Sequence, residues 1–112
     1  VRDGKHWLNF YYGIGAACPD GLYHAQDGLA VSIDLLHWEK VSEPILAYGP
    51  PGSIDSGHAH KAAVFWENGV LYHFYCATCP WKEGYPTMLY DEFRTICVAA
   101  DKPVFPSEGE RR

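Results

Sequence analysis

The sequence is poor in positive charge, and it lacks any long apolar run or sustained helical periodicity. Nine of its 112 residues are Lys or Arg and fourteen are Asp or Glu, giving a formal net charge of −5 at pH 7. This balance disfavours nucleic acid and anionic membranes as partners, because both attract basic surfaces. No apolar run approaches the roughly 20 residues of a membrane-spanning helix. No signal-peptide pattern opens the chain at Val1, so the sequence begins like the interior of a longer protein.

Cysteine is also scarce, with four residues: Cys18, Cys76, Cys79 and Cys97. Cys76 and Cys79 have C-x-x-C spacing, but no second pair at zinc-binding spacing follows and no βαβ pattern surrounds them. We interpret Cys76 and Cys97 as small apolar strand residues, and a disulfide involving Cys18 or Cys79 stays open. The chain has no P-loop motif and no nucleophile-elbow serine, which argues against nucleotide hydrolysis and serine-hydrolase chemistry.

Aromatic residues are abundant instead, at 15% of the chain, with eight Tyr and four Trp. This composition suits aromatic-packed β-structure and also carbohydrate binding, since flat rings stack on the apolar faces of sugars. Short β-type runs alternate with segments rich in glycine and proline. The predicted strands are 6–12, 28–32, 38–41, 62–66, 70–75, 94–99 and 103–105. The predicted long loops are 13–27, 43–56 and 78–93, and residues 1–4 are expected to form a turn.

Two similar multi-strand units follow one another along the chain. Residues 10–13 resemble residues 74–77, and 29–34 resemble 96–101, at offsets of about 65 residues. Asn68-Gly69 predicts a tight hairpin turn inside the second unit. Repeated antiparallel units are typical of propeller blades, and a whole propeller needs about four or more. We therefore expect an incomplete blade at 1–52, a second blade at 53–106 and a tail at 107–112. Further blades or self-association would complete the assembly.

The segment from Ile54 to Val64 is the strongest candidate for a functional site. It places one carboxylate, two imidazoles and one ammonium directly before an apolar strand: Asp55, His58, His60 and Lys61. Convergent titratable groups at the mouth of a strand are typical of a site, whereas a single histidine is commonly a hydrogen-bonded structural residue. His58 and His60 should face the same side of an extended strand, with Lys61 pointing away or sitting at a bend.

A family resemblance extends over nearly the whole chain. The run from Gly28 to Lys40, G-L-A-V-S-I-D-L-L-H-W-E-K, resembles the G-x-A-x-S-x-D-L-x-x-W element of five-bladed β-propeller glycosidases of glycoside hydrolase families 43 and 32. Residues 69–75 and 94–99 are similar to that family's G-x-Y-Y-L-F-Y and R-x-I-x-V-A strands. The resemblance implies an all-β fold of antiparallel four-stranded blades in a five-bladed β-propeller. It implies a turn-capping role for Asp34 and a packing role for Trp38.

The same resemblance implies a glycoside hydrolase that cleaves a polysaccharide or oligosaccharide by carboxylate acid/base catalysis. The candidate residues are Asp55 and His60 for catalysis and His58, Lys61 and Trp81 for substrate binding. No metal ligand and no required cofactor are predicted, although the resemblance points to a central calcium ion and to a secreted or periplasmic location. Lys61 stands where the family often has Asp. Two other hypotheses stay open: a non-catalytic carbohydrate-binding propeller module, and a structural two-blade unit that oligomerises through open edges.

Overall fold

The computed structural model describes residues 1–15, 17–86 and 91–104, and this part of the chain is all-β with no helix. Its strands are β1 (Arg2–Asp3), β2 (His6–Gly13), β3 (Gln26–Ser32), β4 (Glu39–Lys40), β5 (His58–Glu67), β6 (Val70–Pro80) and β7 (Glu92–Ala100). They form one open sheet in the order β1-β2-β3-β5-β6-β7, with β4 paired to β3. The predicted all-β class is confirmed. A membrane-crossing helix is absent from these ranges.

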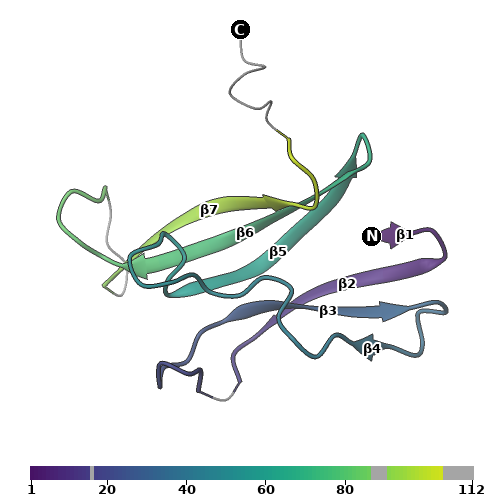
Figure 1. Ribbon diagram of the computed structural model, residues 1–112, viewed down its shortest axis with the longest axis horizontal. Helices are drawn as coiled ribbons and strands as arrows, with labels where there is room; N and C mark the ends of the chain where they lie inside the picture. Colours follow the sequence, from purple (N-terminus) through teal and green to yellow (C-terminus); the bar gives the residue numbers. More distant parts are fainter. Residues whose placement is uncertain (16, 87–90, 105–112) are drawn as a thin grey trace, which may run out of the picture.

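The strands fall into two groups that splay apart from a shared point (Figure 1). β1, β2, β3 and β4 pair antiparallel with one another, and so do β5, β6 and β7. The groups join where Gln26 and Ala59 pair in parallel, and Ala59 N donates to Ala25 O at 3.0 Å. This arrangement is consistent with part of a propeller that is not closed. The division at 52/53 stays a prediction, and the 107–112 tail lies outside the described residues.

The central hairpin of the second group forms as predicted. Asn68 and Gly69 have φ angles of 49° and 76°, the positive values that a tight Asn-Gly turn needs. The predicted loop 78–93 was too long, however, because β6 continues to Pro80 and β7 begins at Glu92. Proline was a poor indicator here, since it is tolerated at the end of a strand.

Smaller corrections concern the ends of strands. The predicted turn at 1–4 contains β1, and the predicted strand 38–41 shortens to β4. Residues 103 and 104 are not in a strand, and Phe105 lies outside the described residues. All four cysteines are free thiols; Cys76 and Cys97 lie on β6 and β7 as partly buried strand residues, as predicted.

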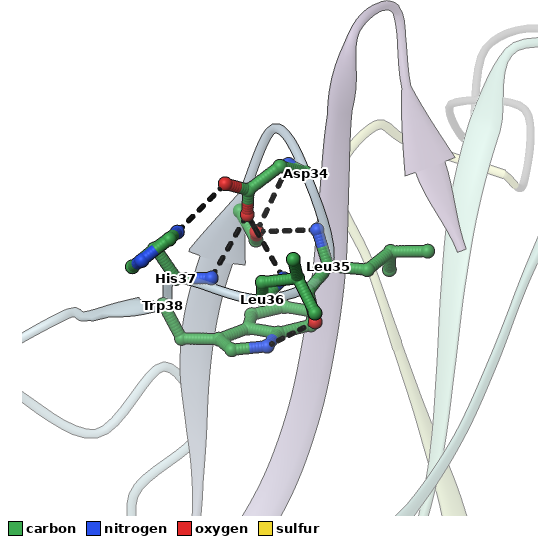
Figure 2. A network of polar contacts seen from close by, with 6 residues as sticks. Asp34, Leu35, Leu36, His37 and Trp38 are labelled. Carbon is green, nitrogen blue, oxygen red and sulfur yellow. Dashed lines mark hydrogen bonds and ion pairs between the residues drawn. The ribbon is translucent and has the colours of Figure 1, made fainter.

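The turn after β3 is a side-chain-capped loop (Figure 2). Asp34 Oδ1 accepts from the backbone N–H groups of Leu36 and His37 at 2.9 and 2.8 Å, and His37 Nδ1 lies 2.7 Å from Asp34 Oδ2. These hydrogen bonds, chiefly that from the His37 backbone, hold the pKa of Asp34 far below its ordinary value. Trp38 Nε1 donates to Leu35 O at 3.2 Å, closing the turn. The turn-capping role implied for Asp34 agrees with this geometry.

The core lies on one face of the β5–β6–β7 group and is built from small side chains. Ala59 and Ala77 have no exposed surface and pack with Tyr75, against which Leu46, Cys97 and Ala99 also lie. On the other face of the same strands, Ile96 and Val98 are 69% and 45% exposed. A buried pair, His73 and Asp27, ties β6 to β3 with 2.6 Å between Nε2 and Oδ2. The sheet therefore has one packed face and one open face.

Candidate functional site

His58 and His60 lie side by side at the start of β5, as the sequence predicts. Their ring centroids are 5.3 Å apart. His58 Nδ1 accepts the backbone N–H of Ala25 at 2.8 Å, so its proton is on Nε2. His60 Nδ1 lies 3.3 Å from Cys76 O, and His60 is 6% exposed. Both imidazoles are therefore fixed by the backbone of a neighbouring segment.

Burial makes both histidines neutral near pH 7. It is the largest cause lowering the pKa of His58, with the carboxylate of Glu92 acting in the opposite direction. Burial also lowers the pKa of His60, and the Cys76 carbonyl partly offsets that effect. Neutral imidazoles can each donate one hydrogen bond and accept another, which suits contacts to hydroxyl groups.

Lys61 sits at a bend in β5. Its φ is +65°, and the pairing of β5 with β6 shifts register between His60 and Ala63. A β-bulge of this kind re-aims side chains, and Lys61 is exposed. Of the two placements open from the sequence, the structure has the bend.

The carboxylate of Asp55 is held by two hydroxyl groups. Tyr75 donates to Oδ2 and Ser53 donates to Oδ1, each at 3.0 Å. Burial and these contacts with Asp55 raise the pKa of Tyr75 well above its ordinary value. Side chains alternate along β6, so Tyr75 lies on the face opposite to Cys76, the pairing partner of His60. Asp55 and His60 thus approach different faces of the sheet.

A pocket of about 450 Å³ lies beside the start of β5. Aromatic rings and short loop residues form much of its wall, including Tyr48, Trp81, Tyr85, His24 and Gly57. Trp81 is 37% exposed, as a ring that stacks on a ligand would be. The structure thus brings the predicted platform residue into a concave, mainly apolar pocket, the usual form of a small-molecule site.

The pocket contains a histidine that sequence reasoning missed. His24 is 6% exposed, and its ring stacks on Tyr48 with centroids 3.7 Å apart. Its Nδ1 faces Gly57 O at 2.5 Å and its Nε2 faces Asp20 Oδ2 at 2.6 Å. Both of those oxygen atoms accept hydrogen bonds, so His24 is held at both ring nitrogens and lines the pocket as a fixed wall. A backbone bond from Leu22, followed by His24, lowers the pKa of Asp20.

Two charged residues at the start of β7 also escaped the sequence reasoning. Glu92 Oε1 lies 3.9 Å from His58 Nε2, and Arg94 Nη2 lies 3.0 Å from Glu92 Oε2. The only signal was the strand pattern beginning at Arg94, which gives no indication of what faces it. Pairing brings them in, because His58 is opposite Thr78 and Thr78 is opposite Arg94.

The described residues do not provide a calcium site. They contain no group of three or more His, Cys, Asp or Glu side chains placed to hold a metal ion. Calcium prefers six to eight oxygen ligands, whereas His58 and His60 offer nitrogen and Asp55 is bound to two hydroxyl groups. The calcium ion that the resemblance implies therefore has no ligand set in this part of the chain.

No protein-family model and no curated protein matches the chain. Two solved structures are similar to it. One is named "Glycoside hydrolase" and is 30% identical with a TM-score of 0.61; the match covers 94% of this chain and 26% of that one. The other is named as a complex of BT0996 and RGII, and it is 32% identical with the same TM-score and the same coverage. The chain therefore has a glycosidase-like fold and spans about a quarter of the length of each structure.

Proposed function

We propose that the chain forms the sugar-binding side of a glycoside hydrolase built as a five-bladed β-propeller of the family 43 and 32 type. The observation that carries the proposal is the 30–32% identity over 94% of the chain to structures of which one is named a glycoside hydrolase. The aromatic pocket with Trp81 supports it, since exposed rings bind sugar faces. Further blades, or a second copy, would supply the remainder of the active site.

Hydrolysis of a glycosidic bond needs one group that protonates the leaving oxygen and one that activates water or attacks the anomeric carbon. The candidate catalytic residues are Asp55 and His60, with His58, Lys61 and Trp81 as substrate-binding residues. Asp55 and His60 approach different faces of the sheet, so the two would not act on one bond in this conformation. Each role is therefore tested by itself.

The test is hydrolysis of a panel of chromogenic aryl-glycosides by the full-length protein and by Asp55→Asn and His60→Ala. A catalytic role predicts a loss of kcat of about 100-fold or more with an unchanged Tm. The matched controls are Asp3→Asn and His6→Ala, which alter an exposed carboxylate and an exposed histidine. If Asp55→Asn lowers the Tm and leaves kcat unchanged, Asp55 holds the loop before β5 to Tyr75 and has no catalytic part.

The second candidate function is a carbohydrate-binding module without catalysis. It is favoured by the engagement of the Asp55 carboxylate with Tyr75 and Ser53, and by Lys61 in place of the family's acidic residue. Binding of a glycan by the full-length protein, with no turnover of any aryl-glycoside, would select it over the hydrolase.

A further inference from the structure

Buried polar atoms without partners gather at one end of the β5–β6–β7 group. Four buried side-chain atoms lack a hydrogen-bond partner among the described residues, and three of them are Thr78 Oγ1, Glu92 Oε2 and Arg94 Nε. Thr78 pairs with Arg94, and Glu92 lies two residues before Arg94, so all three side chains lie on one face. Buried polar groups are normally satisfied, and such a cluster indicates that another molecule completes the hydrogen bonds.

His58 extends this cluster across the sheet. It pairs with Thr78 and lies on the same face, with Nε2–H 3.9 Å from Glu92 Oε1, too far for a hydrogen bond. Arg94 Nη2 approaches Glu92 Oε2 at 3.0 Å without hydrogen-bond alignment, which leaves that oxygen unsatisfied. The side chains of His58, Glu92 and Arg94 are 22%, 26% and 33% exposed, so a ligand can reach them. Thr78 has no exposed surface, and the accessible site consists of the other three residues.

The charges of this cluster balance. Glu92 and Arg94 carry opposite charges, and burial keeps His58 neutral. The available groups are two donors, Arg94 Nε and His58 Nε2, and one carboxylate acceptor. A sugar hydroxyl both donates and accepts, so neighbouring hydroxyls match this mixture. A uronic acid would place a second carboxylate against Glu92, which is unfavourable.

We propose that His58, Glu92 and Arg94 form a binding site for the hydroxyl groups of a neutral glycosyl unit. The inference rests on the proposed carbohydrate function and narrows it to neutral sugars. It places binding on the His58 face of the sheet, and it assigns to Glu92 and Arg94 a role that sequence reasoning did not give them.

The experiment measures binding of the full-length protein to an array of neutral and uronic-acid oligosaccharides, with thermal melting of each variant alongside. Wild type should retain neutral glycans. Glu92→Gln and Arg94→Lys should weaken that binding at least about ten-fold, since each removes a charge-assisted or geometrically fixed contact. Glu67→Gln, at the far end of β5 and exposed, is the matched control and should bind like wild type.

Each other outcome decides against the inference. Unchanged neutral-glycan binding in both variants overturns it and leaves the proposed function standing. A preference of wild type for uronic-acid glycans also overturns it, and this arm holds even if the variants melt early. If no glycan binds, the proposed carbohydrate function fails and this inference fails with it.

Discussion

The buried pair of His73 and Asp27 should be a major source of stability, because it joins the two strand groups through a carboxylate with no exposed surface. We expect His73→Phe to lower the free energy of unfolding by about 3 kcal/mol, since it leaves a buried charge without a donor. Phe retains a ring for the edge contact with Phe10, whose centroid lies 5.3 Å away, so little packing is lost. For a chain of this size, that cost corresponds to a fall in Tm of roughly 10 °C.

A second substitution separates the buried charge from general packing. Asn in place of Asp27 is neutral, so His73→Phe/Asp27→Asn should be more stable than His73→Phe alone by about 1 kcal/mol. Urea unfolding followed by circular dichroism measures all four proteins of this cycle. His6 and Asp3 make the matched control, because they are also cross-strand partners but are exposed; the same two substitutions there should cost almost nothing. Strict additivity at His73 and Asp27 would refute the reasoning.

Two further predictions concern the start of β5. Gly57→Ala should destabilise the protein by about 1–3 kcal/mol, because a Cβ there would lie 2.5 Å from Thr78 Oγ1; Gly13→Ala, which meets nothing within 4 Å, is the control in the same melting assay. Stability should also fall as the pH drops below about 6.5. Burial lowers the pKa of His58 and His60 in the folded state, so the unfolded chain binds more protons in that range. Replacing both histidines with Gln should flatten this part of the pH–stability curve, and an unaltered slope would exclude them as its origin.

Local features of the fold were predictable because their signals lie within a few residues. Asn68-Gly69 states the turn and its positive φ angles directly. Asp34 caps its own turn through residues two and three positions away. The strand ends were less predictable, because Pro80 looked like a loop residue although β6 continues up to it. The length of that strand is set by pairing with β7 rather than by the residues of β6 alone.

The site was predictable only as far as neighbours in sequence are neighbours in space. Strand periodicity correctly put His58 beside His60, whereas Asp55, five residues before His60, has its carboxylate bound on the other face through Tyr75. Proximity in sequence was therefore a poor guide across the start of a strand.

Register decides what the histidines face, and register is a property of three strands at once. A shift of β7 by one residue against β6 would turn Glu92 and Arg94 to the core face and bring Phe93 to the side of His58. The charged pair could not survive on that core face, where Ala59 and Ala77 leave no space and no water. The apolar contacts of Tyr75 and Cys97 with those alanines thus fix the register, and the register brings Glu92 to within 3.9 Å of His58. The chemistry of the open face is in this way determined by the packing of the closed one.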